Sequence, residues 1–272
     1  MSDLTDFIDP HVHAAPEHLP RLLDDIAIAH QASEANMAGV LIKSHTVPTA
    51  DRAFIASMLV PGTSVWGGLV LNKAVGGFNP TAVEVAIAYG AQEIWMPTQD
   101  ATNHCRFYNQ MQAGLSLVES HLPDAVHEIL KLIADHRLIL GTGHLSVAEI
   151  LTLVPLARQH GVEKILITHP EAPFIDMPVP TQQELTQMGC LFERCWVFTT
   201  PALGQVITPA RLMFEIRAVG YESTVLATDM GQVGNPSPIE GLRAYVDACL
   251  RAGFAEREVQ RMGSTHIKEW LT

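Results

Sequence analysis

The sequence predicts an α/β protein folded as a (β/α)8 TIM barrel, and three observations lead to this fold class. Eight short apolar runs alternate with longer segments of helical periodicity along the 272 residues. A glycine follows several helical segments and precedes the next apolar run, which gives repeating units of about 25–35 residues. Such a barrel typically takes about 250 residues, so the number of units and the chain length agree.

The eight predicted strands are nearly continuous apolar runs, as expected for parallel strands that are covered on both faces. They lie at residues 7–8, 40–42, 65–71, 93–96, 138–140, 164–167, 196–198 and 224–227. A doubly wound sheet is the alternative arrangement for alternating strands and helices. No G-x-G-x-x-G or P-loop pattern follows any of the eight runs, and this favours the barrel.

Helical periodicity predicts helices between the strands, with recognisable signals at their ends. The helical segments lie at 22–36, 82–89, 125–135, 150–159 and 239–251. Capping boxes predict helix starts at 146–149, 181–184 and 237–240. Helix ends are predicted at Gly39, Gly90, Gly161, Gly220 and Gly253. We expect a long loop over 99–122 after the fourth strand, as a lid or an extra surface helix, and a C-terminal helix that closes the barrel.

Composition limits the class of protein and its partners. No repeat or low-complexity linker divides the chain, so one barrel domain over 1–272 is expected. The formal net charge is −12, from 17 basic and 29 acidic residues without a basic run, which disfavours nucleic acid as a partner. Neither a membrane span nor a signal peptide is predicted. The four cysteines form no C-x-x-C pair, so a cytoplasmic protein with reduced thiols is expected. A small-molecule substrate is the expected partner, and a homo-oligomer stays open.

Polar side chains gather just after the predicted strands, and all strands of a parallel barrel end on one face. They are His11 and His13 after the first strand, Lys43 and His45 after the second, His144 after the fifth, His169 after the sixth and Asp229 after the eighth. Residues i and i+2 of a strand point the same way, so His11 and His13 can face one cation. Imidazole and carboxylate together suit zinc, and also manganese, iron or nickel.

Four motifs in this order carry a resemblance to a known family. DPHVH at the first strand, GTGH at the fifth, ITHP at the sixth and ATD at the eighth resemble the amidohydrolase superfamily of metal-dependent hydrolases, over nearly the whole chain. The resemblance implies one or two divalent ions, with zinc as the leading candidate. It assigns His11 and His13 to the more buried ion, His144 and His169 to further ligand positions, and Asp229 to the roles of ligand and general base.

The fourth strand departs from the family pattern. Two-metal relatives carry a carboxylated lysine or a glutamate after this strand, whereas the nearest polar residues here are Thr98 and Asp100. Either the site holds one ion or another residue bridges two. Lys43, as a carbamate, is the candidate bridge. His45 is a candidate for substrate binding or for contact with a ligand residue, and a plain loop role is the alternative.

The resemblance implies metal-assisted hydrolysis of a small amide, cyclic amide, lactone or ester, with Asp229, His45 and Lys43 as catalytic candidates. Some relatives with one zinc instead decarboxylate aromatic or unsaturated acids, and the missing bridge favours this alternative. A metal-binding barrel without catalytic activity is the third hypothesis. Lys43, Lys73 and Arg106 would suit an acidic group on the substrate.

Overall fold

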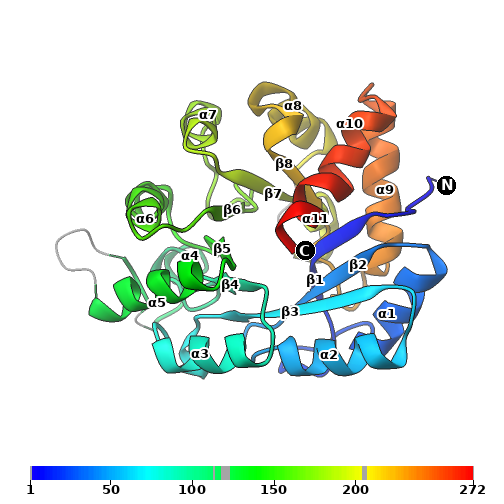
Figure 1. The fold of residues 1–272 in the computed structure, drawn as a ribbon. Coiled ribbons are helices and arrows are strands. Elements are labelled where there is room, and N and C mark those ends of the chain that lie inside the picture. Colours follow the sequence, from blue (N-terminus) through cyan, green and yellow to red (C-terminus); the bar gives the residue numbers. More distant parts are fainter. Residues whose placement is uncertain (1, 113, 118–122, 204–206, 272) are drawn as a thin grey trace.

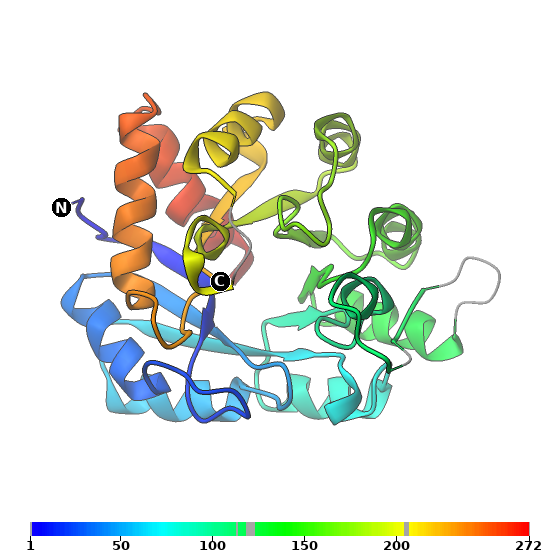
Figure 2. The same ribbon diagram turned by 180° about the vertical axis from the view of Figure 1, so that it is seen from behind.

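Eight parallel strands form one sheet in the order β1 to β8, surrounded by helices (Figures 1 and 2). This computed structural model describes residues 2–112, 114–117, 123–203 and 207–271. The strands are β1 Ile8–His13, β2 Gly39–Lys43, β3 Ser64–Val70, β4 Glu93–Trp95, β5 Ile139–Gly141, β6 Lys164–Thr168, β7 Leu191–Cys195 and β8 Thr224–Ala227. The predicted (β/α)8 barrel is confirmed.

The barrel closes between β8 and β1, beside the predicted site. The backbone N–H of Asp229 donates to the carbonyl of His11, and that of His13 donates to the carbonyl of Met230. The buried Asp9 carboxylate adds a side-chain link, since it accepts from the backbone N–H and the hydroxyl of Thr228. Closure therefore fixes the relative positions of His11, His13 and Asp229 through main-chain hydrogen bonds.

Eleven α-helices lie in the described part of the chain. They are α1 Asp25–Glu34, α2 Ala50–Leu59, α3 Pro80–Ala88, α4 Thr102–Phe107, α5 Asp124–Asp135, α6 Val147–Gln159, α7 Val179–Gln187, α8 Pro209–Val219, α9 Pro238–Arg251, α10 Glu256–Gln260 and α11 His266–Leu271. The expected loop after β4 holds the short helix α4, and part of it (113 and 118–122) lies outside the described residues. None of the described helices is long and apolar enough to cross a membrane.

The helix-end signals are largely confirmed. Capping boxes open α6 at Ser146 and α9 at Ser237, and four of the five glycines have the expected left-handed or otherwise positive φ. The box predicted at 181–184 is wrong, because α7 already begins at Val179 after Pro178. Gly39 is also no helix end. It opens β2, where a side chain would collide with Trp66 of the next strand.

The seventh strand lies five residues earlier than the sequence predicts. Residues 191–195 form β7, and Trp196–Thr199 form a 3₁₀ turn, so the predicted strand at 196–198 is wrong. The cause is a pair of charged residues within the strand, Glu193 and Arg194, both fully buried. Arg194 donates to Gln182 of α7 at 2.7 Å and lies 3.5 Å from the Glu171 carboxylate, which compensates its buried charge.

The lumen of the barrel is apolar at its N-terminal end. Each residue in this layer is buried, and the layer contains Ile8, Leu41, Val70, Trp95, Ile139, Leu166 and Val225. Ile267 and Leu271 of α11 pack against the same layer, so the C-terminal helix covers this end of the barrel as predicted. The opposite end of the lumen carries the polar residues.

Candidate metal centre

Three predicted ligands converge at the C-terminal end of the lumen. Nε2 of His11 and Nε2 of His13 each lie 3.1 Å from Oδ1 of Asp229, and the ligand atoms of all three residues lie within 4.8 Å of one another. The three residues are buried. Two imidazoles and one carboxylate at this spacing are a donor set that fits a zinc-like cation.

The protonation state of this cluster also fits a cation. Although burial opposes it, the Asp229 carboxylate raises the pKa of His11 to about 9. Burial opposes ionisation of Asp229 too, yet His11 and His13 hold the pKa of this carboxyl well below its usual range. Asp229 thus favours its ionised form, which a cation ligand requires, and a metal ion bound here would displace a proton from His11.

His169 and His144 lie on the same pocket, outside this tight group. Both ring nitrogens of His169 are buried and have no hydrogen-bond partner in the described structure, and its ring centroid lies 6.3 Å from that of His11. The rings of His144 and His169 are 4.9 Å apart, and burial lowers the pKa of both well below the usual range. These neutral imidazoles suit cation binding. Nδ1 of His144 lies 2.8 Å from Nδ1 of His104, which orients the ring.

A buried carboxylate backs His11. Oε1 of Glu193 lies 3.2 Å from Nδ1 of His11, and Sγ of Cys195 lies 3.8 Å from the same nitrogen. A carboxylate behind Nδ1 keeps a proton there and leaves Nε2 to face Asp229 or a cation. The sequence did not predict this partner, because the strand that carries it was placed five residues too late.

Lys43 is fully buried, and its Nζ has no hydrogen-bond partner in the described part of the chain. The ammonium lies 5.0 Å from the ring centroid of Trp95 and lines the pocket with His45, His144 and His169. Deeper in the lumen lies Glu93, whose pKa is raised well above its usual range by burial and by the Glu193 carboxylate. The structure therefore places a lysine, and no residue from the end of β4, among the predicted ligands.

Thr98 and Asp100 are engaged away from the ligand cluster. Oγ1 of Thr98 accepts from the Asn72 amide and lies 2.8 Å from Nδ1 of His45, whereas Asp100 accepts the backbone N–H of Lys73. The ring of His45 stacks on His13 at 4.8 Å, and burial lowers its pKa well below the usual range. His45 is thus a neutral, well-oriented side chain at the pocket, as its position in the sequence suggested.

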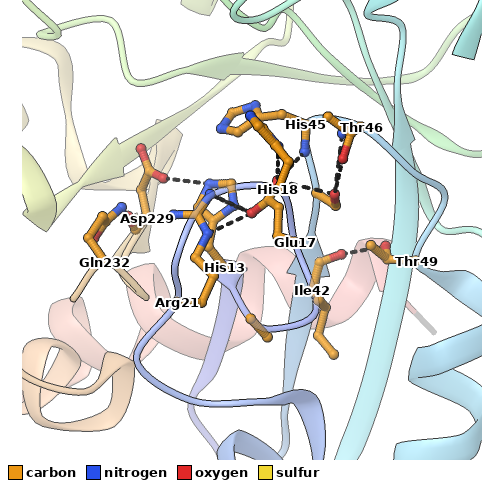
Figure 3. Close-up of polar contacts among 12 residues, drawn as sticks. His13, Glu17, His18, Arg21, Ile42, His45, Thr46, Thr49, Asp229 and Gln232 are labelled. Atoms are coloured by element: carbon orange, nitrogen blue, oxygen red, sulfur yellow. Dashed lines mark hydrogen bonds and ion pairs between the residues drawn. The ribbon is translucent and has the colours of Figure 1, made fainter. Parts of the chain in front are cut away.

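The loop after β1 contributes two residues that the sequence analysis missed, Glu17 and Arg21. Glu17 accepts from Nε of Arg21 at 2.6 Å and from the backbone N–H of His45 at 2.8 Å, and Oε2 lies 3.7 Å from Nδ1 of His13 (Figure 3). Despite burial, the neighbouring His13 and Arg21 hold the pKa of Glu17 well below its usual range. The i, i+4 pair of opposite charges just after H-x-H was the one available signal.

The pocket above the cluster has a volume of about 140 Å³. The polar residues that line it include His13, Arg21, Lys43, His45, His144, His169, Asp229 and Gln232. Tyr108, Phe174 and Phe198 provide aromatic surface. Lys73 and Arg106, which the sequence suggested for an acidic substrate group, are not among the lining residues.

Comparisons with known proteins agree with this fold. Residues 6–193 match the family of unknown function DUF6282. No curated protein matches the chain in sequence. Among solved structures, the probable dipeptidase PvdM from Pseudomonas aeruginosa has a TM-score of 0.70 at 10% identity, covering 97% of this chain and 94% of that one. The lactonase Lmo2620 from Listeria monocytogenes has 0.64 at 10% identity, with 99% and 95% covered. An amidohydrolase from Pseudomonas aeruginosa has 0.64 at 10% identity, with 98% and 95% covered. The resemblance to amidohydrolases is confirmed for the fold.

Proposed function

Because the chain belongs to the DUF6282 family and shares its barrel with a lactonase and an amidohydrolase, we propose that it is a metal-dependent hydrolase of a small amide, cyclic amide, lactone or ester. The observation that carries the proposal is the buried convergence of His11, His13 and Asp229 beside the unpartnered imidazole of His169. This arrangement occupies the end of the barrel where enzymes of this fold carry their active sites.

We assign His11, His13 and Asp229 to one divalent ion, with zinc as the first candidate, and His144 and His169 to further ligand positions. When bound, such an ion supplies a Lewis acid and lowers the pKa of water towards about 7. The Glu193 carboxylate lies 3.2 Å from Nδ1 of His11, and that of Glu17 lies 3.7 Å from Nδ1 of His13. The negative charge of each acid favours the ring orientation in which Nε2 faces Asp229.

Asp229 is the proposed general base and acid. Its Oδ1 takes the proton of the attacking water and returns it to the leaving group. We propose that His45 polarises the scissile carbonyl through Nε2–H, since Oγ1 of Thr98 accepts from Asn72 and can direct its own proton to Nδ1 of His45. Lys43 would either stabilise developing negative charge as an ammonium or bridge a second ion as a carbamate. Phe174 and Phe198 limit the access of water to the pocket.

Decarboxylation by one metal ion is the second candidate function. It is supported by the engagement of Thr98 with Asn72 and His45, and of Asp100 with Lys73, because neither side chain is then available to bridge two ions. This reaction would release carbon dioxide from an aromatic or unsaturated acid and would consume no water into the remaining product.

The test is a panel of esters, lactones, amides and aromatic acids, assayed with protein reconstituted separately with zinc, manganese, iron and nickel. Incorporation of ¹⁸O from labelled water into an acid product would support hydrolysis, whereas carbon dioxide release without incorporation would support decarboxylation. Bound metal without turnover of any member would favour the non-catalytic metal-binding barrel.

We also propose that the protein is cytoplasmic. Its four cysteines support this, since each is buried and is a free thiol.

A further inference from the structure

Arg21 presents an unused edge of its guanidinium at the pocket. Nε and Nη2 pair with Glu17, and Nη2 also lies 3.2 Å from Nδ1 of His13. Nη1 has no hydrogen-bond partner among the described residues, although the side chain is only 4% exposed and lines the pocket. A guanidinium held from one side in this way is preorganised to donate from Nη1 to an anionic acceptor (Figure 3).

The charge around the pocket favours an anion. Two cationic side chains, Arg21 and Lys43, line the cavity, and Asp229 is the only acidic side chain among the described lining residues. Glu17 compensates Arg21 from behind, whereas the Lys43 ammonium has no hydrogen-bond partner in the described structure. A divalent cation on Asp229 would add further positive charge. An anionic ligand would therefore meet two cationic side chains and one carboxylate at the lining of this pocket, although the chain as a whole carries a net charge of −12.

Aromatic side chains line another part of the same cavity. Phe174 and Phe198 lie with ring centroids 6.1 Å apart, and Tyr108 lies 6.2 Å from Phe174. The volume of about 140 Å³ is close to that of apolar cavities of about 150 Å³ that accept benzene. The space therefore accommodates one ring and a small substituent, and it excludes a peptide or an oligosaccharide as a fully enclosed ligand.

We propose that the substrate is a small aromatic carboxylic acid, whose carboxylate binds Arg21 and whose ring packs against Phe174 and Phe198. This inference rests on the proposed function, because the group that is cleaved would be an ester, lactone or amide on the same molecule, facing Asp229. Arg21 acts as a specificity residue. Its charge and its unpaired Nη1 group select the acid over a neutral molecule of the same shape.

The test is calorimetric titration of the metal-loaded protein with benzoate and with benzamide, which has nearly the same shape without the charge. We expect wild type to bind benzoate at least about tenfold more tightly, as for a charge-assisted hydrogen bond. In the double variant Glu17→Gln/Arg21→Met, which removes both charges and leaves no buried carboxylate alone, the preference should fall to about twofold or less. Arg21→Lys should retain only part of it.

Arg106→Ala is the matched control, since it removes an arginine of the neighbouring loop that does not line the pocket, and it should keep the wild-type preference. Equal binding of benzoate and benzamide by wild type would overturn the proposal. An unchanged preference in the double variant would overturn it too, because benzoate would then be binding elsewhere, such as on the metal or Lys43. A preference that depends on Arg21 in a protein without hydrolytic activity would refute the proposed function and leave the anion subsite standing.

Discussion

The two ends of the barrel lumen are built from opposite kinds of residue. Around the N-terminal end, Leu41, Ile139, Leu166 and Val225 form a closed apolar layer against α11. Nearer the C-terminal end, Lys43 of β2 and Glu193 of β7 are fully buried and carry side-chain atoms without hydrogen-bond partners in the described structure. The same holds for Glu93, which opens β4 deeper in the lumen. Buried polar atoms of this kind cost stability.

This difference indicates that one end of the lumen stabilises the fold and the other end carries the candidate site. The apolar layer supplies burial energy and needs no specific partner, so it can stabilise the barrel independently of the site. Burial of the polar residues lowers the stability of the protein in the absence of a ligand. They stay buried because the packing of the rest of the barrel compensates this cost. Substitutions at the two ends should therefore have separable effects on catalysis and stability.

The largest effect is expected for Asp229→Asn. The amide cannot accept a proton from water and is a weaker ligand, so the hydrolysis rate should fall about 10³-fold. The measurement is kcat on the best substrate from the panel, with circular dichroism to check the fold. Asp135→Asn, at an exposed position at the end of α5, is the control and should keep the wild-type rate. A rate within tenfold of wild type in Asp229→Asn would remove this carboxylate from the mechanism.

Leu166→Ala should act at the other end of the lumen. Removing a fully buried side chain from the apolar layer should lower the free energy of unfolding by about 2–5 kcal/mol, measured by denaturant titration. The metal content of the folded protein should stay that of wild type. Leu151→Ala, at a 41% exposed position on α6, is the matched control and should change stability by about 1 kcal/mol or less. A metal loss in folded Leu166→Ala would show that the two layers are coupled.

Glu93→Gln should improve stability in a pH-dependent way. The folded pKa of Glu93 is raised above the unfolded value, so ionisation destabilises the metal-free protein as pH rises from about the unfolded value of 4.5 towards the folded one. Glutamine removes this loss. When both proteins are measured from about pH 5 to pH 8, the stability of the variant relative to wild type should therefore increase with pH. A relative stability that is flat or falls over this interval would contradict the assignment of Glu93 as a destabilising buried acid.

The smallest effect is expected for Lys73→Ala, which lies outside both layers. Its Nζ is 3.9 Å from Asp100, and the side chain is 42% exposed, so loss of this ion pair should cost less than about 1 kcal/mol. The hydrolysis rate should stay within about twofold of wild type, which is checked on the same substrate as Asp229→Asn. A larger loss of activity would mean that the loop after β3 reaches the substrate, contrary to the pocket lining.

The sequence predicted most of the site because its signal was local. His11 and His13 share one strand face by period alone, and His144, His169 and Asp229 each follow directly on a strand, where barrel geometry forces convergence. Glu193 was not predicted because a buried Glu-Arg pair interrupts the apolar pattern that identifies a strand. Arg194 is compensated by Glu171 and Gln182, which are distant in the sequence.

Glu17 and Arg21 escaped for a different reason. They lie in the irregular segment between β1 and α1. Hydrophobic periodicity does not predict how such a segment folds back over the strand ends. Lys73 and Arg106 looked equally suitable for an acidic substrate group, yet the structure brings Arg21 to the pocket instead. Composition and spacing thus located the candidate ligands. The residues proposed to orient them and to select a substrate could be found only from the three-dimensional fold.

Metal content per chain is the direct test of whether His11, His13 and Asp229 bind a metal ion. Inductively coupled plasma mass spectrometry should find about one or two ions of zinc, manganese, iron or nickel per wild-type chain after reconstitution and desalting, and under about 0.1 in His11→Ala/His13→Ala. Leu151→Ala should retain the wild-type content. A wild-type protein that holds no metal after reconstitution, or a folded double variant that holds as much as wild type, would contradict the account.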